Sequence, residues 1–237
     1  MNKIKLQAAA LALAAGWLAT GLAAHAQNMN LQKVLSAMDA SSAKFKDVQA
    51  NITVDLYTAV VQAHEIQTGT TALRRVGKGL EMAIHLKTDD GQPAEKYVLY
   101  KNGNLYYYQP AVKQETIFAA GANRSQWDAM LATGFGATSQ ELNAAWTVTF
   151  QGMEKIDGID TAKLDLVPKQ ANVRDNYVSH LTIWVDLNRD ISLKQVMYMP
   201  SSGDSKTMTY SGIRYNTRLP GSLFELHVAR GTHVQKR

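Results

Sequence analysis

The stretch that decides the fold is residues 96–110, KYVLYKNGNLYYYQP. Its Asn102-Gly103 pair lies between two runs of aromatic and branched residues, which is the strongest short-range signal for a β-hairpin because both residues tolerate a positive φ. Both runs carry apolar side chains at successive positions, whereas a sheet wetted on one face would alternate apolar with polar residues. Each face of this hairpin therefore needs cover, from a core on one side and from a helical layer or an apolar ligand on the other.

The N-terminus has the three parts of a removable secretory signal. Two lysines give a positive start, residues 8–24 form an Ala/Leu-rich apolar run, and Ala24-His25-Ala26 offers the small residues that signal peptidase needs. The apolar run is shorter than the ~20 residues of a membrane span, so we expect cleavage after Ala26. We therefore expect a signal peptide at 1–26, a single domain at 27–237, and export to the periplasm.

Composition limits the possible chemistry. The 237-residue chain has no cysteine, which excludes disulfides, thiol nucleophiles, thiolate metal sites and a lipid-modified cysteine. Its formal net charge of +5 is too small and too scattered to suggest nucleic-acid binding. An exported chain without disulfides must rely on its core, and residues 27–237 suffice for one such core.

The mature chain starts with one helix and continues mainly as strands. Leu31, Val34, Leu35 and Met38 have the spacing of an apolar helix stripe, and Asn30 precedes them as an N-cap. This helix either covers an apolar cavity or is an ordinary core helix. From Val48 the pattern alternates, which predicts an antiparallel meander of about ten strands in one α+β domain. The expected strands are 48–56, 66–75, 80–86, 97–100, 105–108, 146–150, 161–167, 178–186, 191–199, 206–215 and 224–230.

Residues 123–145 interrupt the strand series. Trp127, Met130 and Leu131 have helical spacing, and Thr138-Ser139-Gln140-Glu141 has the form of a capping box before a second short helix. The residues between them, 133–136, read Thr-Gly-Phe-Gly and predict a mobile joint. This insertion is either a lid over the two-faced hairpin or a connector packed on the rim of the sheet.

Motifs for catalysis or metal binding are missing from the sequence. The histidines have no metal-ligand spacing, and residues 186–190, which imitate the start of a calcium loop, lack the Gly and Glu that such a loop needs further on. There is no phosphate-binding loop, no dinucleotide fingerprint and no Gly-x-Ser-x-Gly elbow. We therefore expect no catalytic residue, no metal and no cofactor, and the aromatic and Met-rich strands favour a binding surface.

Several motifs, in their order and spacing, resemble the LolA family of periplasmic carriers of outer-membrane lipoproteins. Arg75 lies where the family has a basic residue before proline, although Val76 follows it here. Residues 99–110 resemble the family's strand, Asp-Gly turn, strand and Tyr-x-Pro ending, and residues 181–186 resemble a later strand. Residues 224–234 resemble its closing Phe-x-Phe and Gly-Val segment, so the resemblance covers nearly the whole mature chain.

The resemblance implies an α+β fold, namely an incomplete, half-open antiparallel β-barrel with helices forming a lid over an apolar cavity. It also implies a monomeric carrier that takes acylated lipoproteins or lipids from an inner-membrane ABC-type releasing complex and delivers them to an outer-membrane receptor. No nucleic acid is expected as a partner. Each buried acyl CH₂ contributes ~0.8 kcal/mol, so affinity needs no single polar group.

The resemblance also implies roles for individual residues. Arg75 would bind the lid backbone and favour the closed state, and the neighbouring Arg74 competes for this role. The side chains expected to line the acyl-chain cavity are Leu35, Met38, Leu99, Leu105, Tyr107, Trp127, Met130, Trp184 and Met197.

Three alternatives stay open at this stage. The same half-barrel could carry another lipid. It could also belong to an envelope signalling protein that senses lipids or lipoproteins through the same face, although such proteins usually add a second domain. Finally, a secreted hydrolase could assemble its site from scattered residues.

Overall fold

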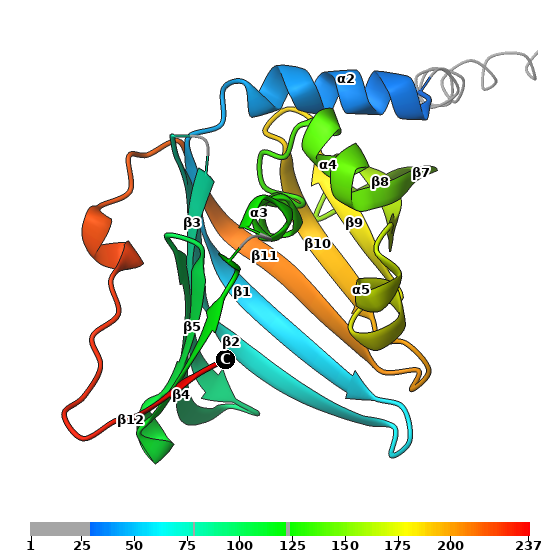
Figure 1. Ribbon diagram of the computed structural model, residues 1–237. Helices are drawn as coiled ribbons and strands as arrows, with labels where there is room; N and C mark the ends of the chain where they lie inside the picture. Colours follow the sequence, from blue (N-terminus) through cyan, green and yellow to red (C-terminus); the bar gives the residue numbers. More distant parts are fainter. Residues whose placement is uncertain (1–28, 78, 122–123) are drawn as a thin grey trace, which may run out of the picture.

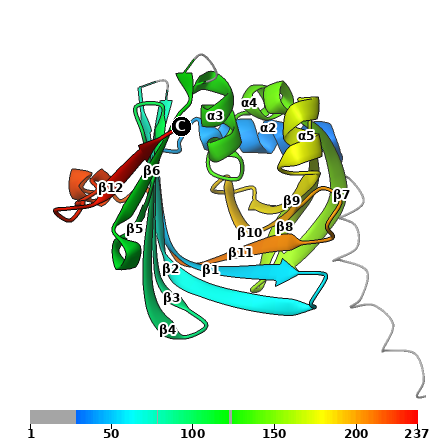
Figure 2. The ribbon, with the colours of Figure 1, turned by 60° about the horizontal axis from the view of Figure 1, so that its bottom comes forward.

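The computed structural model describes residues 29–77, 79–121 and 124–237, so the expected signal peptide at 1–26 lies outside the described residues (Figure 1). The strands form one twelve-stranded sheet in the order β12-β6-β5-β4-β3-β2-β1-β11-β10-β9-β8-β7. Neighbouring strands are antiparallel, except that β12 and β6 are parallel. The sheet curves around one side and stays open between its edge strands (Figure 2). This confirms the expected α+β fold with an incomplete antiparallel barrel.

The first half of the sheet grows outward from the central strand β1, and the second half returns to it. The first half consists of β1 (Asp47–Thr58), β2 (Ala63–Val76), β3 (Gly79–Asp89), β4 (Gln92–Lys101), β5 (Asn104–Gln109) and β6 (Gln114–Ala119). The second half consists of β7 (Trp146–Ile156), β8 (Ile159–Pro168), β9 (His180–Asp186), β10 (Ile191–Tyr198) and β11 (Ser205–Tyr215), and the short β12 (His233–Lys236) ends the chain.

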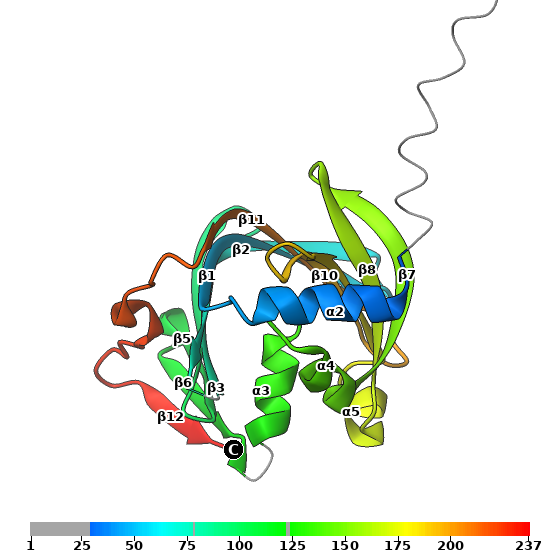
Figure 3. The same ribbon diagram turned by 90° about the horizontal axis from the view of Figure 1, so that it is seen from above.

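Helices cover one end of the concave side of the sheet (Figures 1 and 3). They are α2 (Leu31–Ser42), α3 (Arg124–Ala132), α4 (Ser139–Ala145) and α5 (Ala171–Asn176), with short 3₁₀ turns η1 (Pro110–Val112) and η3 (Gly221–Phe224). The predicted N-cap of α2 is confirmed, because the Asn30 side chain accepts a hydrogen bond from Lys33 N at 3.0 Å. The predicted capping box of α4 is also confirmed, by reciprocal bonds between Thr138 and Glu141.

The main core lies between the concave face and these helices. Val34 and Met38 of α2 are fully buried in it, and the alternating apolar residues of β1 point into it from the centre of the sheet. The helix predicted at 31–42 is therefore a core helix that also lies over the barrel.

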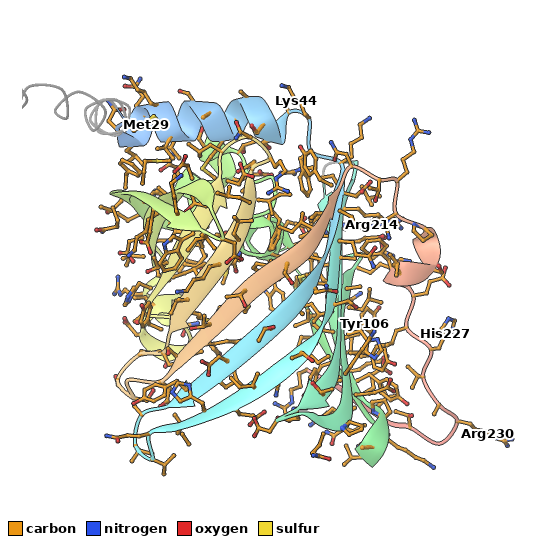
Figure 4. All side chains as sticks on the ribbon, turned by 180° about the vertical axis from the view of Figure 1, so that it is seen from behind. Met29, Lys44, Tyr106, Arg214, His227 and Arg230 are labelled. Atoms are coloured by element: carbon orange, nitrogen blue, oxygen red, sulfur yellow. The ribbon has the colours of Figure 1, made fainter. Side chains whose placement is uncertain are left out.

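The convex face of the hairpin is covered by the C-terminal segment. Ala72 and Leu99 form a second, smaller core with Leu219 and the fully buried Phe224, against which Tyr106 also packs. Figure 4 shows the segment that carries His227 and Arg230 running past this side of the sheet. Both faces of the hairpin are thus covered, but the outer cover is the C-terminal segment with its single 3₁₀ turn η3, where the sequence predicted a helical layer or a ligand.

Four elements differ from the sequence-based expectation. Residues 224–230 do not form a strand, and Phe224 and Leu226 of this segment pack on the convex face of the sheet. The strand that pairs with β6 at this end of the sheet is instead the short β12. Strand β6 and helix α5 are additional elements that the sequence did not suggest.

The expected mobile joint at 133–136 is in fact a buried, anchored linker. Phe135 forms a β-bridge with Ile191, and Ser192 N donates to Gly134 O at 2.6 Å. Gly134 and Gly136 both have positive φ, +81° and +70°, and both are approached closely by other side chains. The two glycines therefore allow neighbouring side chains to pack closely against the backbone of this linker.

Gly136 provides a test of this packing. A Cβ added there would lie 2.5 Å from the ring of Phe45, whereas Gly158, with a similar φ of +80°, has no atom within 4 Å of the added Cβ. Gly136→Ala and Gly158→Ala should both lose about 1 kcal/mol through the left-handed backbone. Gly136→Ala should lose about 1–3 kcal/mol more through overpacking. Urea unfolding of both variants measures the difference, and equal losses would contradict the anchored linker.

Candidate functional site

The concave face of the sheet carries a continuous set of partly exposed apolar side chains. Cross-strand pairing places Met82, Tyr100 and Leu105 in one row across β3–β5. A second row crosses β1, β11 and β10. In it, Leu56 of β1 and Met197 of β10 lie on either side of Lys206 of β11. The members of this concave apolar surface that remain partly exposed and pack against the main core are Leu56, Met82, Ile84, Leu105, Phe150, Met153, Met197 and Met208.

A lid lies over one end of this surface. We use the word for α3, α4 and the linker 133–138 between them (Figure 3). Trp127, Met130 and Leu131 of α3 pack against the main core. Between α3, α4, α5 and the first strands of the second half is a cavity of about 150 Å³. Its lining consists of Ala129, Met130, Ala144, Ala145, Trp146, Pro168, Gln170 and Val173, of which only Gln170 is polar.

The size of this cavity matters for what it can hold. Apolar cavities of ~150 Å³ accept molecules about as large as benzene. A long acyl chain is several times larger and does not fit inside this cavity as it stands.

Arg75, near the end of β2, is bound to the lid through both terminal nitrogens of its guanidinium. Nη2 of Arg75 donates to Gly136 O of the linker and, at 3.0 Å, to Glu141 Oε2 of α4, while Nη1 donates to Glu141 Oε1 at 3.2 Å. The fork of fixed donors that arginine offers suits such a combined carbonyl and carboxylate site. Arg74 points elsewhere, because it donates to Glu81 and stacks over the Phe224 ring at 4.2 Å on the convex side.

Glu141 connects Arg75 to the start of helix α4. Its carboxylate accepts hydrogen bonds from Thr138 N at 2.8 Å and from Arg75. Burial disfavours the charged form of Glu141, but the bonds from Arg75 and from Thr138 outweigh burial and lower the pKa of the carboxyl below its ordinary value. Glu141 therefore stays ionised at neutral pH and accepts hydrogen bonds both from the N-cap residue of α4 and from Arg75 of β2.

A second polar contact joins the lid to the wall of the barrel. The fully buried Tyr100 of β4 donates its hydroxyl to Asp128 Oδ1 of α3 at 2.6 Å. Burial, and then the bond to Asp128, raise the pKa of Tyr100, so the phenol remains a donor at all physiological pH values. Among the described residues, the first half of the barrel is thus hydrogen-bonded to the lid by side chains on β2 and β4.

The lid is attached more extensively to the second half of the barrel and to α2. Gln195 Nε2 donates to Thr133 O at 3.2 Å, and Gly136 N donates to Asp190 O at 2.9 Å. On the α2 side, the Asp39 carboxylate accepts from both N and Oγ of Ser139 at 2.7 Å. The linker is thus bonded to β10 and to the turn before it.

Asp190 is a buried carboxyl beneath this junction. Its side chain is fully buried, and neither carboxylate oxygen has a hydrogen-bond partner among the described residues. Burial raises the pKa of Asp190 to about 8; nearby Arg75 acts in the opposite direction, and Asp39 and Glu141 raise it further. At neutral pH this group is therefore mostly the neutral acid.

The structure brings together most of the side chains that the sequence proposed for a cavity. Met38 is inside the main core, and Leu35, Leu105, Trp127, Met130 and Met197 pack against it. Tyr107 shares the concave face, since it lies two residues from Leu105 on the same strand.

Leu99 and Trp184 lie on the convex face, so the sequence assigned these two to the wrong side of the sheet. Leu99 belongs to the second core under the C-terminal segment. Trp184 lies between the ammonium groups of Lys163 and Lys194, which are 5.0 and 4.7 Å from its ring. Their strands are apolar on both faces, so the alternation of side chains could not indicate which face is concave.

Several groups at the site were missed by the sequence analysis. The capping-box pattern identified Glu141 but not its pairing with Arg75. Tyr100 and Asp128 meet only in the fold, and Asp190 was seen only as part of a turn. Lys206 was also missed, although the alternation with Met208 and Tyr210 on its strand was a usable signal.

Two further searches concern only the described ranges. Within them, no helix is long and apolar enough to cross a membrane. Within the same residues, no three His, Asp or Glu side chains are grouped closely enough to hold a metal ion. The histidines instead make separate contacts, such as the stacking of His85 on Tyr97 at 4.2 Å.

Comparison with known proteins gives a match only at the level of structure. No protein-family model matches the chain, and no curated protein matches it in sequence. An uncharacterized conserved protein from Thermus thermophilus superposes with a TM-score of 0.52 at 10% identity, over 87% of this chain and 98% of that one. A LolA superfamily protein from Nitrosomonas europaea gives a TM-score of 0.41 at 16% identity, over 84% and 98%.

The chain is similar in fold to LolA-superfamily proteins. A domain from Vibrio parahaemolyticus described as an outer membrane lipoprotein-sorting protein also matches, with a TM-score of 0.46 at 16% identity, over 83% of this chain and 97% of that one. At these identities the likeness concerns the fold alone. The half-open barrel predicted from the sequence is confirmed by the sheet itself, and what the chain does with this fold is a separate question.

Asp190 gives the stability of the protein a measurable pH dependence. Between its ordinary pKa of 3.8 and the raised value of about 8, the unfolded chain releases a proton that the folded chain keeps. The free energy of unfolding should therefore fall as pH rises through this window, by up to about 1.4 kcal/mol per pH unit, and level off above it. Asp190→Asn should flatten this fall, and asparagine also tolerates the left-handed φ of +54°.

Urea unfolding of the wild type and Asp190→Asn between pH 5 and 9 measures the effect. The other carboxyls titrate in both proteins, so the difference between the two curves isolates Asp190. Curves that stay parallel over this range would contradict a raised pKa for Asp190.

Proposed function

We propose that this protein is a periplasmic carrier that binds the acyl chains of lipoproteins between the concave apolar surface and the lid, and moves them from the inner to the outer membrane. The observation that supports this most directly is an apolar, partly exposed sheet face with a helical lid fastened to its wall by Arg75. A carrier needs both parts, because its cargo must be shielded from water and then released.

The energetics of such a site suit transport. Each acyl CH₂ removed from water contributes ~0.8 kcal/mol, so a long chain binds strongly without any specific polar contact. Flexible methionines such as Met82, Met197 and Met208 on the concave surface adapt to chains of different shape. Affinity is then controlled by how easily the lid opens.

The hydrogen bonds suggest how the lid opens. The linker is bonded to Asp190, Ser192 and Gln195 around the start of β10, whereas Arg75 and Tyr100 provide the polar contacts with the first half of the barrel. We infer that the lid and α2 stay with β10 while the wall formed by β2–β4 moves away. That movement requires the hydrogen bonds of Arg75 and Tyr100 to the lid to break.

The partners follow from the same proposal. The cargo would come from an inner-membrane ABC-type releasing complex and would pass to an outer-membrane receptor. The monomeric carrier would act without a cofactor and without catalysis. Signal peptide cleavage after Ala26 and residence in the periplasm complete the proposal.

The experiment that tests the function is release of lipoproteins from membranes. Purified protein lacking residues 1–26 is mixed with spheroplasts that hold newly made lipoproteins, and the supernatant is examined for a one-to-one complex. Release of a diacylated or triacylated lipoprotein supports the carrier. If no lipoprotein is released but the extracted protein carries phospholipid or glycolipid by mass spectrometry, the cargo is another lipid. If neither is found, a sensor of envelope lipids becomes the better description.

Arg75→Leu tests the lid itself. The variant loses charge-assisted hydrogen bonds from a guanidinium that is three-quarters buried, worth on the order of 1.5 kcal/mol, so the lid should open about tenfold more often. The rate at which the neutral apolar fluorophore diphenylhexatriene binds should rise by about the same factor.

Arg214→Leu is the matched control. Arg214 makes one long bond, 3.4 Å, to Gln49 Oε1 away from the lid and should leave the rate unchanged (Figure 4). Arg75→Lys keeps the charge but loses the planar fork and should be intermediate. An Arg75→Leu protein that remains folded and takes up the dye at the wild-type rate would rule out the fastening role.

A further inference from the structure

Lys206 is a cation within an otherwise apolar part of the concave surface. It is the second residue of β11, and its cross-strand neighbours are Leu56 on β1 and Met197 on β10. Met208 and Tyr210 follow it on the same face of the strand and pack against the main core. Because the pairing is regular over residues 205–210, the Lys206 side chain must emerge on the concave side.

The ammonium group of Lys206 has no hydrogen-bond or ion-pair partner among the described residues, whose twelve ion pairs involve other side chains. Burial lowers the pKa of its amine, and no carboxylate opposes that effect. Leaving a partly desolvated charge unpaired costs free energy, so the position is explained better by a ligand than by stability.

Lys96 shows what a structural lysine on the same face looks like. Its Nζ donates to Asp89 Oδ2 at 2.9 Å and lies 3.8 Å from Glu65 Oε1. Burial works against its charge, yet these carboxylates raise the pKa of Lys96 above the ordinary value. Lys96 is thus neutralised by the protein itself, whereas Lys206 is not. Glu65 lies in the same cross-strand row as Lys206, but Leu56 is between them.

We propose that Lys206 binds the carboxylate of a long-chain fatty acid whose hydrocarbon tail lies along the concave apolar surface toward the lid. The inference rests on the proposed function, because it uses the same surface and names a ligand class for it. One ammonium among apolar neighbours matches a small head group with a single charge and two oxygens. A phosphate ester has more oxygens, for which Leu56, Met197 and Met208 offer no donors.

The position of Lys206 also suits a head group. Strand β11 begins at the end of the sheet opposite α2 and runs toward the helices (Figure 1). From Lys206 to Tyr210 the strand rises ~13 Å, and the Tyr210 ring meets Phe135 of the linker edge-on at 5.0 Å. A chain anchored at Lys206 would pass Met208 and reach the lid, with its carboxylate left near the open end.

The test compares oleate with oleyl alcohol, its uncharged counterpart of equal chain length, at pH 7.5. Binding to the wild type is measured by displacement of diphenylhexatriene. Oleate should bind at least tenfold more tightly than the alcohol, and Lys206→Met should reduce this preference to about onefold while leaving the affinity for the alcohol unchanged. Lys206→Arg should keep most of the preference. The methionine variant retains the apolar stem of the side chain and should fold at least as stably as the wild type.

Lys194→Met is the matched control, because Lys194 is on the adjacent strand but on the convex face over Trp184. It should bind both ligands as the wild type does. Equal binding of oleate and oleyl alcohol to the wild type, or an unchanged preference in Lys206→Met, would overturn the role of Lys206 while the carrier function stands. The wild type could instead bind lysophosphatidylglycerol more tightly than oleate and lose this preference in Lys206→Met. That result would overturn the proposed carboxylate ligand in favour of a ligand with a phosphate head group. If neither oleate nor the alcohol displaces the dye, the apolar site itself, and with it the proposed function, fails.

Discussion

The architecture depends on one constraint: the strands of the β4–β5 hairpin are apolar on both faces, so neither face can be left to water. On the concave side the constraint is met by α2, α3 and the main core. On the convex side it is met by the C-terminal segment, whose Phe224 is fully buried over Ala72 and Leu99. The sheet can then curve without closing, since helices cover one end of its concave side and the short β12 lies outside β6 as the edge strand.

The covering on the concave side is incomplete, and this makes a binding function plausible in physical terms. A closed core would exclude solvent from every apolar residue, but Leu56, Ile84 and Met197 remain partly exposed. The cavity among α3, α4 and α5 is too small for an acyl chain. The partly exposed residues of the concave surface would therefore have to supply the apolar area for a long ligand.

The polar contacts of the lid are unevenly distributed between the two halves of the barrel. Backbone hydrogen bonds and a β-bridge join the linker to the start of β10, and such contacts are lost only together. The first half of the barrel is held by the side chains of Arg75 and Tyr100, which can separate from the lid without unfolding any strand. The buried, mostly neutral Asp190 beneath the junction avoids placing a further charge beside Glu141 at neutral pH.

Local sequence patterns predicted much of this. The Asn-Gly turn predicted the hairpin, the spacing of Val34 and Met38 predicted the stripe of α2, and Thr138 with Glu141 predicted the start of α4. These signals depend on residues within one turn or one strand pair, so they can be read directly from the chain. The resemblance to LolA carriers directed attention to Arg75, whose bonds to Gly136 and Glu141 span more than sixty residues.

What the sequence determined by itself is therefore local: most of the strands, the helices α2 and α4 with their caps, the hairpin turn and the apolar character of the strands. Tertiary structure alone decided which face of each strand became concave, and so placed Leu99 and Trp184 outside and Lys206 inside. It also decided that Arg75, and not Arg74, meets the lid. The physical reason is that a strand alternates with period two, so neighbouring residues take opposite faces, and only packing between distant segments fixes which face is covered by which partner.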